Sequence, residues 1–195
     1  KLQDKRYTTP DGLSFDKDDF VIISVVNLIP VKGIEVLIEA VNELKNPKIK
    51  LCIIGNDKGE YAEQLKHIAN SNSTIHFLGK KLDVRPYHAL ADLFVIPTLK
   101  LGEGLPIAPI EAMASGCIVI GSAVSGVKDV LKPFPECMFQ PNNVASLKEK
   151  IVYILNMDQI NKDLLQHKMR SSVESEFSIQ RFIATHENLY KNLTQ

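Results

Sequence analysis

The chain has 195 residues, of which 45% are apolar and 24% are charged. These fractions lie close to the averages of globular domains and exclude disordered, collagen-like and membrane-embedded classes. Lysine plus arginine and aspartate plus glutamate number 23 each, so the chain has no global field that would attract nucleic acid. We therefore expect one globular domain in which any anion-binding site is local.

The cysteines and the apolar runs indicate the cellular setting. Cys52 and Cys117 lie within apolar, strand-like runs, where a small buried thiol is the usual role of cysteine. No stretch approaches the roughly 20 apolar residues that a membrane-spanning helix needs. The first residues do not resemble a signal peptide, and we expect a reducing, cytoplasmic protein.

In chain order, residues 1–19 are polar and follow neither helical nor strand periodicity, which predicts a linker that leads into a domain over residues 20–195. Residues 20–26 form a continuous apolar, β-branched run, as expected of a parallel strand covered on both faces. The next segment, 34–44, has apolar residues at helical spacing.

The alternation of strands and helices continues through the rest of the chain. Further strands are predicted at 49–54, 75–78, 93–96 and 117–120, and further helices at 61–69, 87–91, 106–114 and from residue 145 to the end. This order predicts an α/β fold with a Rossmann-like parallel sheet of about six strands flanked by helices. Ligands of such sheets bind beyond the carboxyl ends of the strands.

Two of the predicted post-strand loops have residues that suit a diphosphate only in part. In loop 27–33, Gly33 at a helix start would let backbone amides approach an anion, and Lys32 would add a positive charge. A lysine beside a turn glycine is also common as a solvated surface residue. Loop 55–59 fits a polar turn as well as it fits a ligand contact.

The third loop, residues 98–106, is more informative. It contains Glu103 between two glycines and leads into a helix whose first amides, at Gly104 and Leu105, favour a negative ligand together with the helix dipole. Glu111 follows within an otherwise apolar helix. A carboxylate buried there would cost several kcal/mol without partners, and ribose hydroxyls would be suitable partners. The alternative is that Glu111 points to solvent.

Residues 103–116, EGLPIAPIEAMASG, resemble the E-x7-E signature of family 4 retaining glycosyltransferases, which have the GT-B fold. Lys32-Gly33, the strand end at Gly55, Phe77-Leu78-Gly79 and the run 91–98 support this resemblance in order and spacing. The resemblance covers residues 20–193 and implies the C-terminal, donor-binding half of such an enzyme. On this resemblance, we expect the N-terminal half, which would bind the acceptor, to be missing from this chain.

The resemblance also implies roles for individual residues. Glu103 would contact the donor sugar, Glu111 the ribose and Lys32 the diphosphate, which the amides of Gly104 and Leu105 would cradle. The segment from Gly79 to Leu82 would border the base. The implied site has Glu103 and Lys32 as catalytic residues and Asn27, Gly33, Gly55, Gly79, Lys81, Leu82, Gly104, Leu105, Pro106 and Glu111 as donor-binding residues.

The implied reaction moves a hexose from a nucleoside diphosphate sugar to a glycan or lipid-linked acceptor, with retention and without a metal or other cofactor. The isolated domain would be inactive, and the complete protein would work in the cytoplasm, peripheral to the inner face of the membrane. The run Asp16-Lys17-Asp18 matches the D-x-D pattern of metal-dependent glycosyltransferases, but its position before the first strand predicts a solvated charge run.

One departure from the family keeps a second interpretation open. Where many relatives have Gly-Arg, this chain has Val26-Asn27, so an arginine that helps to neutralise the leaving diphosphate is missing. A non-catalytic nucleotide-sugar-binding module therefore remains an alternative. A dinucleotide-dependent oxidoreductase is a weaker one, because it would have G-x-G-x-x-G after the first strand.

Overall fold

A computed structural model describes residues 7–99 and 104–193 of the chain. Its centre is a parallel sheet of six strands in the order β5-β4-β3-β6-β7-β8. The strands are β3 (Phe20–Val25), β4 (Ile49–Ile54), β5 (Ile75–Phe77), β6 (Leu93–Ile96), β7 (Ile118–Ser122) and β8 (Met138–Phe139). This sheet confirms the Rossmann-like fold expected of one half of a GT-B glycosyltransferase.

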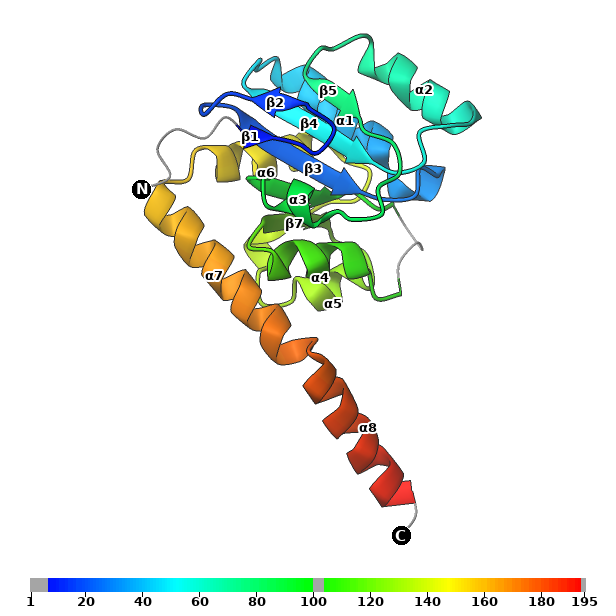
Figure 1. Cartoon of the computed structure of the whole chain (residues 1–195), viewed down its shortest axis with the longest axis vertical. Helices are drawn as coiled ribbons and strands as arrows, with labels where there is room; N and C mark the ends of the chain where they lie inside the picture. The colour runs from blue at the N-terminus through cyan, green and yellow to red at the C-terminus, as the bar shows by residue number, and fades with distance from the viewer. Residues whose placement is uncertain (1–6, 100–103, 194–195) are drawn as a thin grey trace.

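Helices flank the sheet (Figure 1). They are α1 (Ile34–Leu44), α2 (Glu60–Ala69), α3 (Arg85–His88), α4 (Ile107–Ala114), α5 (Val127–Val130), α6 (Val144–Leu155), α7 (Gln159–Glu176) and α8 (Ile179–Leu193), with 3-10 turns at Pro30–Lys32 and Pro135–Cys137. Helix α1 packs against α2 and α6, and α4 packs against α7. Because helices cover both faces, the central strands β3, β6 and β7 are buried along nearly their whole length.

The observed bounds agree with the predicted ones where the periodicity is strong. The predicted helix 34–44 and strand 49–54 have the same bounds in the structure. The helical tail predicted from residue 145 is divided into α6, α7 and α8. The sequence did not reveal α5 or β8, since elements of four and two residues are too short to show a period.

The segment before Phe20 differs from the predicted linker. Strand β1 (Tyr7–Thr8) pairs with β2 (Ser14–Phe15) in an antiparallel hairpin, and Phe15 is only 3% exposed within the hydrophobic core. The hairpin therefore packs on the domain. Residues 16–18, the D-x-D run, are exposed as expected.

The last helix extends away from the sheet (Figure 1). Its exposed apolar side chains are Ile179, Phe182, Ile183, Leu189 and Tyr190. Within residues 7–99 and 104–193, no helix combines the length and apolar character that crossing a membrane requires.

The three cysteines are buried, which confirms the expectation for Cys52 and Cys117. Burial raises the pKa of Cys52, Cys117 and Cys137 to about 12. Thiols with such a pKa remain protonated and unreactive at neutral pH. The cysteines therefore act as small apolar core residues.

His88 is a buried histidine without a conventional hydrogen bond. It is 1% exposed, neither ring nitrogen has a hydrogen-bond partner of normal geometry, and its ring packs edge-on against Phe94 at a centroid distance of 5.7 Å. Burial lowers the pKa of His88, and a weak interaction with the backbone of Glu111 acts in the opposite direction. The folded protein thus favours the neutral imidazole.

We expect the free energy of unfolding to fall as the pH drops below about 6.5, the pKa of histidine in an unfolded chain. The unfolded chain then binds a proton that folded His88 resists, at a cost of up to about 1.4 kcal/mol per pH unit. Urea unfolding at pH 7.5 and 5.5 measures this slope. His88→Leu should reduce it, while His67→Leu, on the exposed side of α2, should not. His76, whose pKa burial also lowers, accounts for a remaining slope, and an unchanged slope in His88→Leu would contradict the prediction.

Candidate donor-binding site

The loops that follow β3, β4 and β5 form a cleft of about 670 Å³ at the carboxyl edge of the sheet. Its lining comprises Val25, Val26, Asn27, Ile54, Gly55, Asn56, Lys80 and Lys81. The predicted site residues Asn27, Gly55 and Lys81 therefore come together, although they are far apart in the sequence. They do so because the carboxyl ends of parallel strands meet at one edge.

Gly55 lets the first two loops lie against each other. A Cβ atom at Gly55 would lie 2.1 Å from the backbone oxygen of Val26, which only glycine avoids. The amide of Gly55 donates to the carbonyl of Gly79 at 3.2 Å, so the third loop joins the same wall. Gly79 has φ +69°, a conformation that favours glycine. Both predicted glycines thus shape the backbone of the cleft.

Gly33 joins the loop after β3 to the loop after β6. It caps α1 with φ +62°, and a Cβ atom there would lie 2.3 Å from the backbone oxygen of Pro97. The amide of Leu99 donates to the carbonyl of Val31 at 2.8 Å. Lys32, which is half-buried, precedes Gly33 directly. It therefore lies in the loop that is held against Pro97 and Leu99, directly after β6.

The N-terminus of α4 has the form that the sequence predicts. Gly104 and Leu105 are exposed, and Pro106 is buried at the N-cap position, with α4 beginning at Ile107. Pro106 lies one position before the first-turn place expected for it. An exposed turn at the positive end of a helix suits an anion. Glu103 falls outside the described residues, so its predicted contact with the sugar stays a prediction.

The hypothesis of a buried Glu111 carboxylate is wrong, and the alternative that Glu111 points to solvent is confirmed. Its side chain is exposed, because α4 buries the opposite side, with Pro109, Ala112 and Met113, against the sheet and α7. Burial therefore creates no need for a compensating ligand. The predicted contact of Glu111 with a ribose now depends on the resemblance alone.

The two residues predicted beside Gly79 have different positions. Lys81 lines the cleft, but its ammonium group donates to the Asp11 carboxylate at 2.8 Å. Leu82 is fully exposed and is not among the residues that line the cleft. Lys80 and Asn56 also line the cleft. They lie in the segment 79–82 and the loop 55–59 that the sequence places near a ligand, but they were not among the predicted site residues. No sequence pattern indicated Asp11.

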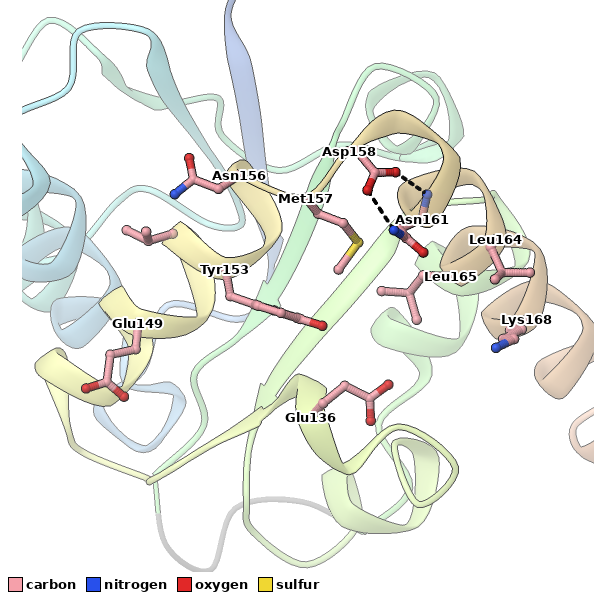
Figure 2. A pocket seen from close by; sticks show the side chains of 11 residues that line it. Glu136, Glu149, Tyr153, Asn156, Met157, Asp158, Asn161, Leu164, Leu165 and Lys168 are labelled. Atoms are coloured by element: carbon pink, nitrogen blue, oxygen red, sulfur yellow. Dashed lines mark hydrogen bonds between the residues drawn. The ribbon is translucent and has the colours of Figure 1, made fainter.

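A second cavity, of about 840 Å³, lies between α6, α7 and the turn at Pro135–Cys137 (Figure 2). The Nζ atom of Lys162, in α7, lies 5.5 Å from the ring centroid of Phe20. Because Phe20 begins β3, this part of α7 lies at the amino end of the strand, away from the cleft at the carboxyl edge. Figure 2 shows Asp158 bonded to Asn161, whose amide and side chain donate to it at 2.9 and 2.7 Å. Asp158 thus caps α7, and the predicted site residues do not line this cavity.

Comparison with known proteins gives the family to which the chain belongs. The family model described as Glycosyl transferases group 1 matches residues 6–172. A GDP-mannose-dependent monoacylated alpha-(1-6)-phosphatidylinositol monomannoside mannosyltransferase from Corynebacterium glutamicum is 30% identical over 193 residues, covering 89% of this chain and 50% of the relative. A Campylobacter jejuni N,N'-diacetylbacillosaminyl-diphospho-undecaprenol alpha-1,3-N-acetylgalactosaminyltransferase is 23% identical over 93% of this chain and 48% of its own length.

Solved structures show the same fold. A glycosyltransferase from Rickettsia africae superposes with a TM-score of 0.85 at 19% identity, over 92% of this chain and 49% of that one. The Anabaena protein HepE in complex with UDP and glucose superposes with a TM-score of 0.79 at 18% identity, over 91% of this chain and 48% of HepE. The chain spans about half the length of the curated relatives that it matches. The match over residues 6–172 shows that the chain belongs to the glycosyl transferases group 1 family.

Proposed function

We propose that this chain is the donor-binding half of a family 4 retaining glycosyltransferase that moves a hexose from a nucleoside diphosphate sugar to a glycan or lipid-linked acceptor. One observation carries the proposal: the loops that follow β3, β4 and β5, each of which holds a residue predicted to contact the donor, line one cleft at the carboxyl edge of the sheet. Ligands of open parallel sheets bind at this edge.

Helix N-termini and a lysine at this edge of the sheet support a diphosphate-containing donor. Two helix N-termini, of α1 and α4, adjoin it through Gly33 and Pro106, and each favours negative charge. Lys32 lies at the first of them and is the residue we assign to the diphosphate. We propose that Glu103 contacts the sugar and that the reaction needs no metal, because lysine and helix-terminal amides stabilise the leaving diphosphate.

Our proposals for the acceptor and for the cellular location of the protein are based on the relatives. The names of two relatives include an undecaprenol-linked and a phosphatidylinositol-linked acceptor. We propose that a separate N-terminal half binds an acceptor of this kind and that the complete protein works in the cytoplasm, peripheral to the inner face of the membrane. The isolated chain would then bind the donor without transferring its sugar.

Titration calorimetry with UDP, GDP and NAD tests the proposal. We expect the chain to bind UDP or GDP with a Kd between about 1 μM and 1 mM, the range of ordinary enzyme ligands, and not to bind NAD. Binding of NAD without binding of either nucleoside diphosphate would overturn the assignment.

Asn27 supports a second candidate, a non-catalytic nucleotide-sugar-binding module. Its exposed amide lines the cleft at the position where the family resemblance implies an arginine, so this wall lacks one positive charge for a leaving diphosphate. A screen of nucleotide sugars with the full-length protein distinguishes the two candidates. Transfer to an acceptor supports the enzyme, and donor binding without transfer or donor hydrolysis supports the module.

Glu111→Ala tests the ribose contact without the complication of unfolding. Because Glu111 is exposed, the free energy of unfolding should change by no more than about 0.5 kcal/mol. The affinity for UDP or GDP should still fall about threefold to tenfold through lost hydrogen bonds. Calorimetry and urea unfolding measure the two quantities, with Glu60→Ala on α2 as an exposed control. An unchanged affinity would remove Glu111 from the site.

A further inference from the structure

The N-terminal hairpin reaches the wall of the cleft through Asp11. One oxygen of the Asp11 carboxylate accepts a hydrogen bond from the Lys81 ammonium group at 2.8 Å, and the other accepts one from the hydroxyl of Tyr87 at 2.5 Å. The Lys81 nitrogen also lies 5.9 Å from the centroid of the Tyr87 ring. These three residues, the Asp11 cluster, join the hairpin, the loop after β5 and helix α3.

The Asp11 cluster stabilises the ionised form of the Asp11 carboxylate. Tyr87 is 4% exposed, so its hydroxyl is a fixed donor rather than a mobile one. The side chains of Lys81 and Asp11 are 21% and 38% exposed. The hydrogen bond from Lys81, followed by that from Tyr87, lowers the pKa of Asp11, so the carboxylate is ionised at neutral pH. The Lys81 ammonium is therefore close to a full negative charge.

Lys80 provides a direct contrast. It lines the same cleft as Lys81, but its side chain is exposed. The two neighbouring lysines thus differ: the Lys81 ammonium group is paired with a carboxylate, whereas the Lys80 side chain is exposed to solvent. An ammonium group that already contacts a carboxylate has one of its three N–H donors occupied and much of its positive charge offset, so it attracts a phosphate less than an exposed ammonium group does.

We propose that Asp11 holds the Lys81 ammonium group away from the donor, so that Lys81 forms the wall of the cleft with its aliphatic stem and Lys80 adds a positive charge to the one assigned to Lys32. This inference rests on the proposed function, since it assumes that a nucleoside diphosphate occupies the cleft. It makes Asp11 a positioning residue, in a segment whose sequence predicts only a linker.

The two lysines form a matched pair for the first test. Calorimetry with UDP and GDP, at 50 mM salt, compares Lys80→Met with Lys81→Met, each of which keeps an unbranched stem. We expect Lys80→Met to weaken binding of the diphosphate about threefold to tenfold. Lys81→Met removes an ammonium group whose charge Asp11 already offsets, so it should weaken binding less than Lys80→Met does. A larger loss in Lys81→Met than in Lys80→Met would overturn the inference.

Asp11→Asn tests the positioning itself. Without the negative charge, the Lys81 ammonium becomes available to the diphosphate, so affinity should rise about threefold to tenfold at 50 mM salt and the gain should shrink at 500 mM. The double variant Asp11→Asn with Lys81→Met should show no gain in affinity over Lys81→Met alone. A structural disturbance of the hairpin would persist in the double variant and would not depend on salt, and either result would refute the inference.

The same titrations separate the two proposals. If the unmodified chain binds neither UDP nor GDP, the proposed function fails, and the inference fails with it. If the unmodified chain binds one of them but Asp11→Asn leaves the affinity unchanged, only the inference fails.

Discussion

Gly33→Ala is expected to lower the free energy of unfolding by about 3 kcal/mol or more, from left-handed strain and from overpacking. The backbone of Gly33 has φ +62°, where an alanine is strained. Its Cβ atom would also lie 2.3 Å from the carbonyl oxygen of Pro97 and 2.9 Å from a methyl carbon of Leu99. Because the first of these is a backbone atom, a change of rotamer cannot relieve the contact.

Gly116→Ala is the matched control, because it introduces left-handed backbone strain without a steric clash of the new Cβ atom. Gly116 has φ +88°, and a Cβ atom there would meet nothing within 4 Å, so this change should cost only about 1 to 2 kcal/mol. Urea unfolding measures both variants. At temperatures where Gly33→Ala remains folded, its affinity for UDP or GDP should also fall, since the collision separates the loops after β3 and β6. Equal destabilisation of the two variants would show that the contact with Pro97 relaxes freely.

Lys32→Ala is expected to weaken binding of UDP or GDP about 10-fold to 100-fold, because a charge-assisted hydrogen bond contributes about 1.5 to 3 kcal/mol. The affinity for uridine or guanosine, which lack the diphosphate, should change by less than about twofold. In the full-length protein the same change should lower kcat about 100-fold to 1000-fold, the cost of removing one donor that stabilises developing charge.

Lys58→Ala is the control for Lys32→Ala. Lys58 is exposed in the loop after β4. Neither it nor Lys32 is among the residues that line the 670 Å³ cleft, and we assign Lys58 no contact with the donor, so its removal changes the net charge by the same amount as Lys32→Ala. Calorimetry at two salt concentrations separates a local contact from a long-range effect. If Lys32→Ala weakened the binding of the diphosphate and of the nucleoside equally, Lys32 would not belong to the site. The same would hold if Lys32→Ala and Lys58→Ala weakened diphosphate binding equally.

The cleft itself was predictable to a useful extent. The positions of Asn27, Gly33, Gly55 and Gly79 after strands could be inferred from the sequence, because each follows an apolar run and parallel strands place their carboxyl ends at one edge. The environment of Glu111 could not. An apolar composition around a helical residue does not say which side of the helix faces the core, and α4 turns Glu111 outward.

By itself, the sequence determined the parallel α/β fold, the bounds of α1 and β4 and the order of the loops that form the cleft. Each of these depends on periodicity or on residue type within a short window. Only the tertiary structure decided that Phe15 enters the core, that Gly33 lies against Pro97 and that Asp11 pairs with Lys81. Such contacts join segments that are distant in sequence. Local propensity cannot predict them, because it depends on neighbouring residues alone, whereas these partners come within reach only when the chain folds.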